Sequence, residues 1–297
     1  MSEANLIARI RELFPRAGDD AAIVGDQVIT NDVLVEDVDF TADTPPHFVA
    51  RKAIAVNLSD LAAMGARPLH AVVAIGSPDE ERARALIEEL GRERRIEIVG
   101  GDLSRAAKLF VSVTAVGEAK QPLLRRGARR GDRIYVSRPL GAAAAGLHFI
   151  RRPPAAGAAY ALREFAESAV RRHLDPEPEV ELGMKLVGIA TSCIDISDGL
   201  SSDLHHLCDA SGLGAEIERQ RIPVFPGLQE AGLDVRAAVL HGGEEFALLF
   251  TSSLRESELS ARVGRPVYAI GRMVEEKGVR LDGAPLEPRG WDHFSAS

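Results

Sequence analysis

The sequence predicts an α+β protein built from two mixed α/β domains. Helical and strand-like segments follow one another along its 297 residues without the regular strand–helix–strand alternation of a parallel α/β fold. This length suits one large or two ordinary domains, and 45% hydrophobic residues supply a sizeable core. The break at Pro139-Leu140-Gly141 precedes an Ala/Gly-rich segment. We therefore expect an N-terminal domain over residues 1–137 and a C-terminal domain over residues 138–297.

Hydrophobic periodicity predicts the elements of the first domain. Helical spacing is found in residues 6–14, 47–64 and 79–95, and Gly65 with Pro68 closes the second of these helices. Strands are expected over residues 21–25, 27–32, 69–75, 97–99, 109–117 and 133–137.

The second domain has a mixed order of elements. Its expected helices cover residues 141–151, 158–172 and 178–188, with another after Gly199. Its expected strands are one that ends at Asp195 and those over residues 215–218, 246–251 and 267–272.

Charge and composition exclude several functional classes. The 36 Lys and Arg against 44 Asp and Glu give a net charge of -8, which argues against nucleic acid as the main partner. No run approaches the ~18–20 apolar residues of a membrane-spanning helix, and no signal peptide is visible. Cys193 and Cys208 lack metal-site spacing and fit a reducing compartment. We expect a cytoplasmic protein without a membrane or nucleic-acid partner.

Five short acidic segments carry the candidate chemistry, and each is expected where a strand or helix begins or ends. They are Gly18-Asp19-Asp20, Thr30-Asn31-Asp32, Asn57-Leu58-Ser59-Asp60, Gly100-Gly101-Asp102 and Asp195-Ile196-Ser197-Asp198. Carboxylates next to Gly, Ser, Thr and Asn suit hard divalent cations, which prefer oxygen ligands. Two carboxylates about 4 Å apart repel each other by roughly 4 kcal/mol at an effective dielectric of 20. If the segments meet in space, several Mg²⁺ ions would relieve that repulsion and also carry a nucleotide.

Each of these acids has a simpler interpretation when taken alone. Asp60 lies in an apolar helical stretch, where it is a metal ligand or a local partner of Ser59. Asp32 ends a predicted strand, where turn chemistry also explains it. Asp198 precedes the helix after Gly199, so it is a metal ligand or a helix cap, while Ser197 lies where a helix N-terminus favours an anion.

Other nucleotide-binding and catalytic signatures are absent from the sequence. It has no phosphate-binding P-loop, no protein-kinase catalytic loop, no nucleophile elbow and no HExxH metal motif. The adjacent pair His205-His206 points in two directions on a helix, which favours a structural role over a shared metal.

The order of the acidic segments resembles that of the thiamine-monophosphate kinase family, within the aminoimidazole ribonucleotide synthetase-like superfamily. The likeness spans nearly the whole chain. Its motifs are Gly18-Asp19-Asp20-Ala21-Ala22, residues 56–66 (VNLSDLAAMGA), Gly100-Gly101-Asp102, Arg125-Arg126-Gly127-Ala128, Gly131-Asp132, residues 194–200 (IDISDGL), residues 242–246 (GGEEF) and Gly290-Trp291-Asp292-His293-Phe294.

The resemblance implies ATP-dependent phosphorylation of thiamine monophosphate to thiamine diphosphate. It also implies a homodimer formed through the N-terminal sheet and a C-terminal domain that closes over the ATP cleft. Mg²⁺-ligand positions fall on Asp20, Thr30, Asn31, Asp32, Asp60, Asp102, Asp195 and Asp198. ATP-contact positions fall on Gly101, Asp102, Arg125 and Ser197. Substrate positions fall on Asp39, Glu244 and Trp291.

The expected reaction needs no side-chain catalyst. The acceptor is already an ionised phosphate oxygen, so positioning and charge neutralisation by Mg²⁺ suffice for direct in-line transfer without a phosphoenzyme. Trp291 suits stacking on a cationic thiazolium or on the pyrimidine, although a core aromatic near the C-terminus is also compatible.

Two single residues and one three-residue segment depart from the family pattern. Asp39 stands where the family usually has a substrate-contacting His, Asn31 replaces a common Thr, and Glu245-Phe246-Ala247 replaces the usual Asp-Tyr-Glu. Two alternatives therefore stay open. One is an ATP-dependent superfamily relative with another small-molecule acceptor, and the other is a non-catalytic paralogue that binds nucleotide and metal.

Overall fold

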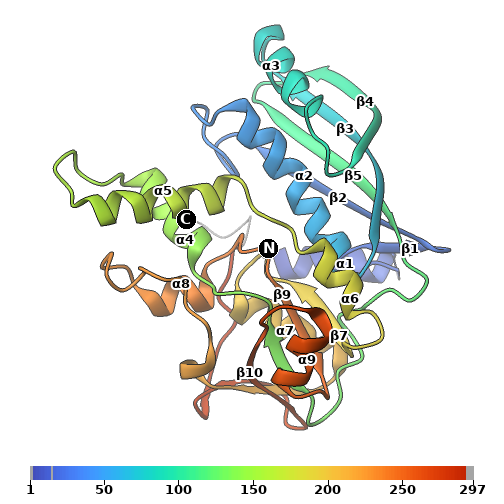
Figure 1. Ribbon diagram of the computed structural model, residues 1–297. Coiled ribbons are helices and arrows are strands. Elements are labelled where there is room, and N and C mark those ends of the chain that lie inside the picture. The colour runs from blue at the N-terminus through green and yellow to red at the C-terminus, as the bar shows by residue number, and fades with distance from the viewer. Residues whose placement is uncertain (1–2, 15, 292–297) are drawn as a thin grey trace.

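The structure is a computed structural model that describes residues 3–14 and 16–291. It consists of two mixed α/β domains, each built on its own sheet (Figure 1). The predicted α+β class with two domains is therefore confirmed. No helix in the described part of the chain is long and apolar enough to cross a membrane.

The first sheet has five strands in the order β1-β2-β5-β3-β4. The strands are β1 (Ala22–Val24), β2 (Gln27–Val35), β3 (Arg67–Ser77), β4 (Glu97–Arg105) and β5 (Phe110–Glu118). Helices α2 (Pro46–Ala63) and α3 (Glu80–Leu90) belong to the same domain, and α2 packs against β2 and β5. The sheet is mixed, because β3 pairs in parallel with β4 and antiparallel with β5.

Alternation along β2 decides which side chains face α2. Thr30 and Leu34 are buried on that side, and Thr30 Oγ1 donates a hydrogen bond to Asp60 on α2. Asn31 lies on the opposite side, where its amide donates to the hydroxyls of Ser112 (3.1 Å) and Thr114 (2.8 Å) on β5. The two faces of one strand therefore carry different parts of the Thr30-Asn31-Asp32 segment.

The second sheet has seven strands in the order β12-β11-β8-β10-β6-β9-β7. They are β6 (Arg133–Val136), β7 (Ser192–Asp195), β8 (Gly214–Ile217), β9 (Leu248–Ser252), β10 (Tyr268–Val274), β11 (Gly278–Leu281) and β12 (Ala284–Pro285). The helices of this part are α4 (Ala142–Arg151), α5 (Tyr160–Leu174), α6 (Val180–Leu186), α7 (Leu200–Ser211), α8 (Val235–His241) and α9 (Glu256–Val263), with a 3₁₀ turn at Arg219–Arg221. The division at residue 138 stays a prediction, but β6 already belongs to the second sheet, so the chain passes from one sheet to the other between β5 and β6.

Helix α2 joins the two domains. Most of its residues are apolar, and 13 of its 18 residues are buried. This pattern is typical of a helix that is covered on several sides. One side packs on the first sheet, and another contacts β7 and α6 of the second domain. Gly183 on α6 allows the closest approach, since a Cβ at this position would lie 2.0 Å from the Ala62 carbonyl oxygen.

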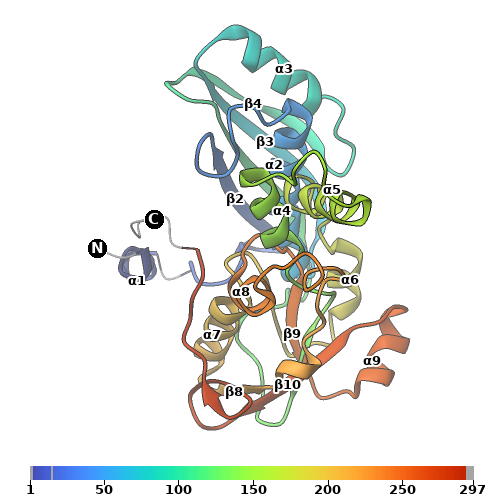
Figure 2. The same cartoon turned by 90° about the vertical axis from the view of Figure 1, so that its left-hand side faces the viewer.

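The N-terminal helix α1 (Glu3–Leu13) confirms the first predicted helix but is not packed in the core. Its apolar residues Leu6, Ile10 and Leu13 are exposed by 37%, 46% and 55%. Figure 2 shows this helix to one side of the two domains.

Several predicted boundaries were wrong. The helix expected to reach residue 95 ends at Leu90, because Gly91 caps it. Strand β2 continues to Val35, so Asp32 is internal and does not end the strand. Strand β4 continues to Arg105, so Gly100-Gly101-Asp102 also lies inside a strand. Helices α8 and α9 and strands β11 and β12 were not predicted.

Candidate active site

Three carboxylates from distant parts of the chain meet where the two domains join. Oxygen atoms of Asp20, Asp60 and Asp195 all lie within 4.8 Å of one another. Asp20 comes just before β1, Asp60 lies in the last turn of α2, and Asp195 ends β7. The first two belong to the first domain and the third to the second, so this group of three carboxylates, the carboxylate cluster, exists only when the domains are together.

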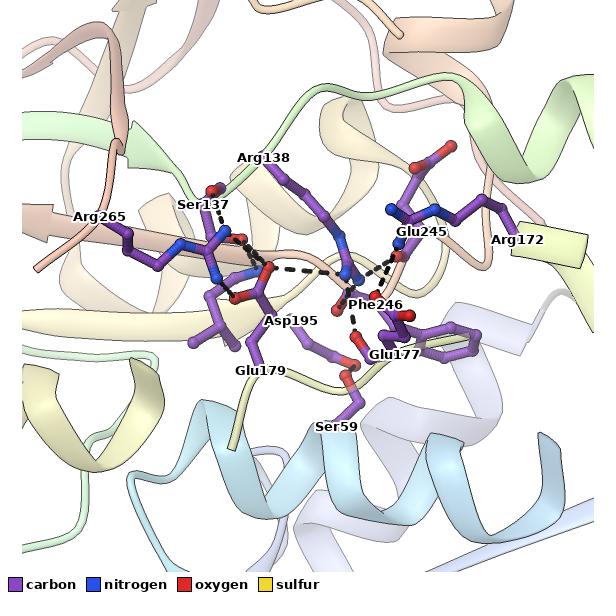
Figure 3. Close-up of polar contacts among 11 residues, drawn as sticks. Ser59, Ser137, Arg138, Arg172, Glu177, Glu179, Asp195, Glu245, Phe246 and Arg265 are labelled. Atoms are coloured by element: carbon purple, nitrogen blue, oxygen red, sulfur yellow. Dashed lines mark hydrogen bonds and ion pairs between the residues drawn. The ribbon is translucent and has the colours of Figure 1, made fainter. Parts of the chain in front are cut away.

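Hydroxyl and amide side chains fix the carboxylate cluster. Thr30 donates to Asp60 Oδ2, and Ser59 Oγ donates to Asp195 Oδ2 at 2.6 Å across the domain junction. Figure 3 shows this second pair, with Ser59 reaching from α2 toward Asp195. Asn57 ties β2 to α2, because its Oδ1 accepts from the Asp32 backbone N–H at 3.2 Å. Residues 57–60 of α2 therefore contact Thr30, the Asp32 backbone and Asp195, and so link β2, α2 and β7.

Arg125 neutralises one side of the carboxylate cluster. Its Nε and Nη2 donate to Asp20 Oδ1 at 3.1 and 2.7 Å, and its backbone N–H donates to Asp19 Oδ1 at 2.9 Å. The Asp20 side chain has no exposed surface, and its second oxygen, Oδ2, has no hydrogen-bond partner among the described residues. A buried carboxylate oxygen without a donor is costly unless a cation or another ligand satisfies it.

Ionisation of all three carboxyl groups of the carboxylate cluster is unfavourable without a cation. Burial, followed by repulsion from Asp20, raises the pKa of Asp195 to about 8. Burial and repulsion from Asp32 and Asp195 raise the pKa of Asp60 well above its usual value. Burial also raises the pKa of Asp20, although Arg125 opposes that shift. Buried acids crowded together in this way either hold protons or share a cation.

Asp32 is a fourth carboxylate beside the cluster. Its side chain contacts Asp60, and burial raises its pKa. Since the oxygen ligands of this region are Asp and Thr, the donor set fits a hard divalent cation such as Mg²⁺.

A second acidic group lies at the start of α7. Ligand atoms of Asp198, Asp203 and His206 are within 4.8 Å of one another. Asp203 is 1% exposed, and its Oδ2 accepts from the backbone N–H groups of Gly199 (3.0 Å) and Asp198 (3.2 Å). Asp203 thus caps the helix, a role that was not predicted from the sequence. Its position three residues before His206 on one helix was the available signal.

Three predicted site residues lie away from the carboxylate cluster. The Asn31 amide is on the far face of the first sheet, bonded to β5. Gly101 and Asp102 are exposed on β4, which is an edge strand of that sheet. The structure therefore does not bring the Asn31 and Asp102 side chains together with Asp60, and their roles as ligands stay predictions.

The loop before β9 and Trp291 are both attached to the Asp195–Asp198 segment by backbone hydrogen bonds. The Glu244 backbone N–H donates to the Ser197 carbonyl at 2.6 Å, so the loop is attached to the Asp195–Asp198 segment. Glu244 has a positive φ of 61°, a conformation that is rare for residues other than glycine. Trp291 also lies by this segment: its backbone N–H donates to the Asp198 carbonyl at 3.4 Å, and the residue is 49% exposed.

A buried polar network supports that strained loop (Figure 3). Arg138 Nη2 donates to the carbonyls of Glu245 (2.8 Å) and Phe246 (2.6 Å). The Glu245 carboxylate in turn accepts from the first backbone N–H groups of α4, at Gly141 and Ala143, both at 2.9 Å. Burial raises the pKa of Glu245 to about 7. The longer Glu, where the family pattern has Asp, thus serves as a helix cap in this protein.

Comparison with known proteins identifies the family. Two family models match, the AIR synthase related protein N-terminal domain over residues 18–119 and its C-terminal domain over residues 129–283. Thiamine-monophosphate kinase of Aquifex aeolicus is 33% identical over 277 residues, which cover 90% of this chain and 88% of the relative. That of Halobacterium salinarum is 34% identical over 301 residues, with 99% and 100% covered.

The chain belongs to the thiamine-monophosphate kinase family. Solved structures agree with this assignment. A structure described as AaThiL complexed with AMPPCP and TMP is 31% identical with a TM-score of 0.89, and the match covers 99% of this chain and 97% of that one. The enzyme of Stenotrophomonas maltophilia K279a is 33% identical, with a TM-score of 0.79 over 96% and 98% of the two chains. The hydrogenase maturation protein HypE of E. coli, at 22% identity and a TM-score of 0.67, shares the fold.

The structure also brings residues into this site that the family motifs did not indicate. Lys52 and His173 contact Glu244, although neither lies in one of the family motifs. The available signal for Lys52 was a charged residue in a helical stretch that is otherwise apolar, the same reasoning that singled out Asp60.

Proposed function

We propose that this protein transfers the γ-phosphoryl group of ATP to the phosphate of thiamine monophosphate, forming thiamine diphosphate. The observation that carries the proposal is the carboxylate cluster formed across the domain junction in a chain of this family. A relative of the same fold is described as complexed with AMPPCP and TMP, which supports both substrates. The phosphate groups of donor and acceptor are both negatively charged, so a site that brings them together has to neutralise negative charge.

We propose that Asp20, Asp60 and Asp195, with Asp32 and Thr30 beside them, hold Mg²⁺ ions. Asp20 Oδ2 supports this assignment, because it is buried and no described residue donates to it. When bound, Mg²⁺ screens the repulsion between the two phosphate groups and orients them for in-line transfer. Asp198 is a further ligand, and Asn31 and Asp102 stay as weaker candidates because of where their side chains lie.

The remaining proposed roles divide between the two ends of the site. Arg125 and the Ser197 region bind ATP, where Arg125 keeps its charge because Asp20 raises its pKa despite the opposing effect of burial. Glu244 and Trp291 bind the thiamine moiety. Asp39 is a further candidate on the Glu244 side, because Lys52 contacts both the Glu244 carboxylate and the Asp39 carbonyl. No side chain needs to take a proton from the acceptor, because a phosphate oxygen is already ionised at neutral pH.

We further propose that the protein is a cytoplasmic homodimer joined through the first sheet. Strand β4 is an edge strand whose Val99 and Leu103 are 55% and 56% exposed, and unpaired apolar edges of this kind favour pairing with another chain. Sedimentation of the purified protein at the mass of a single chain would contradict the dimer.

A direct assay tests the proposed function. Purified protein with ATP and excess Mg²⁺ is expected to form thiamine diphosphate from thiamine monophosphate, measured by chromatography of the products. Chelation of the metal is expected to stop the reaction. Calorimetry that detects ATP binding but no acceptor binding, together with an absence of product, would instead indicate a non-catalytic paralogue.

A further inference from the structure

Lys52 is a fully buried cation in the interdomain region. It lies on α2, two turns before Asp60, among the buried residues Val49, Ala50 and Ala53, and is 1% exposed. An ammonium group removed from water needs a counter-charge and hydrogen-bond acceptors, otherwise its burial is strongly unfavourable. The partners of Lys52 therefore have to be fixed by the fold.

The partners of Lys52 are two of the three predicted substrate residues, and they come from different domains. Lys52 Nζ lies 2.5 Å from Glu244 Oε1, on the loop before β9 of the second domain. The same Nζ donates at 3.2 Å to the carbonyl oxygen of Asp39, which follows β2 in the first domain. One ammonium group thus joins two of the three residues that the family pattern places at the substrate, Asp39 and Glu244.

His173 lies next to the other carboxylate oxygen of Glu244. Its Nδ1 lies 3.2 Å from Glu244 Oε2, but the geometry is not that of a hydrogen bond, and this buried nitrogen has no partner among the described residues. Burial lowers the pKa of His173 to about 4, so the ring is neutral at physiological pH. Among the described residues, Lys52 is therefore the cation that balances Glu244. The buried His173 Nδ1, without a hydrogen-bond partner among these residues, lies beside the Glu244 carboxylate, whose side chain is 30% exposed.

We propose that Lys52 is a positioning residue for the acceptor. It fixes the Glu244 carboxylate at the wall of the site, where that carboxylate receives the organic cation of the acceptor. The inference rests on the proposed function. It deepens that function by making acceptor recognition depend on a bond between α2 and the second domain. The binding of ATP, which uses Arg125 and the carboxylate cluster, does not depend on this bond.

Steady-state kinetics of Lys52→Met tests the proposal. The KM for thiamine monophosphate is expected to rise about tenfold or more, as the loss of a charged hydrogen bond implies, while the KM for ATP stays within about twofold. The double variant Lys52→Met with Glu244→Gln is expected to have the same KM for thiamine monophosphate as Glu244→Gln alone. Each change removes the same interaction, the one between Lys52 and Glu244. Lys52→Gln carries the same test if the Met variant does not fold, since it also removes the charge.

Arg51→Met is the matched control. Arg51 precedes Lys52 on α2, and its Nε also bonds across the junction, to Asp175 Oδ1 at 2.7 Å, but it is exposed to solvent. This variant is expected to keep the wild-type KM for thiamine monophosphate. Three results would each overturn the proposal: an equal rise in both KM values for Lys52→Met, additive effects in the double variant, or the same acceptor defect in Arg51→Met. A wild-type protein without activity would overturn the proposed function itself, so the two failures are distinguishable.

Discussion

Replacing Asp60 with Asn is expected to lower kcat by about 10²–10³-fold or more, the loss that follows removal of one electrostatic group aimed at a transition state. Asp60 lies at the centre of the site: it contacts Thr30 and Asp32, and its oxygen atoms lie within 4.8 Å of ligand atoms of Asp20 and Asp195. Asparagine keeps the shape but cannot balance a divalent cation. The measurement is the rate of thiamine diphosphate formation at saturating ATP, acceptor and Mg²⁺.

The same variant is expected to fold normally. Because burial already opposes ionisation of Asp60, a neutral amide removes repulsion within the carboxylate cluster, so the metal-free protein should unfold at the wild-type temperature or above it. Asp26→Asn, in the exposed turn between β1 and β2, is the control for the loss of one negative charge. Turnover by Asp60→Asn close to that of the control variant would remove Asp60 from the catalytic metal site.

The metal-free protein is expected to lose stability as the pH rises toward 8. The pKa of Asp195 is about 8 in the folded protein and near 3.8 when the chain is unfolded. Between these values the folded state holds a proton that the unfolded state lacks, so the free energy of unfolding falls by up to about 1.4 kcal/mol per pH unit. Asp60 shifts in the same direction, whereas His173, with its lowered pKa, acts in the opposite direction below about pH 6.5.

Urea unfolding between pH 6.5 and 8, with and without Mg²⁺, measures this effect. Mg²⁺ competes with the bound protons, so it is expected to stabilise the protein more at pH 8 than at pH 6.5. Asp195→Asn should flatten the profile of the metal-free protein. A metal-free stability that is constant or increases across this range would show that the carboxylate cluster does not hold protons in the folded state.

The acidic residues that meet at the junction could be recognised from the sequence, but their meeting could not. Asp60 stood out because an apolar helix carried a carboxylate, and Asp195 because it joined a predicted strand to a helix start. Their proximity depends on how α2 packs against β7 of the other domain, which local patterns do not contain. Strand alternation, by contrast, was readable in advance: Asn31 lies between Thr30 and Asp32, so its side chain had to face the opposite side of the sheet.

The acceptor end was the least predictable part. The family likeness indicated Glu244 and Asp39 but not Lys52 or His173. Lys52 on α2 and His173 on α5 contact Glu244 only because the fold packs these helices against the loop before β9. The strained loop was also invisible in the sequence, because positive φ angles at Glu244 and Phe246 are not expected for these residue types. They persist because Arg138 and the Glu245 cap hold the surrounding backbone.

Asp20, Asp60 and Asp195 are proposed to hold a cation together across the domain junction. Anomalous diffraction from crystals grown with Mn²⁺ and a non-hydrolysable ATP analogue would locate that cation. We expect an anomalous peak within bonding distance of oxygen atoms from all three carboxylates. A structure with the nucleotide bound but no peak among these carboxylates would contradict this proposal.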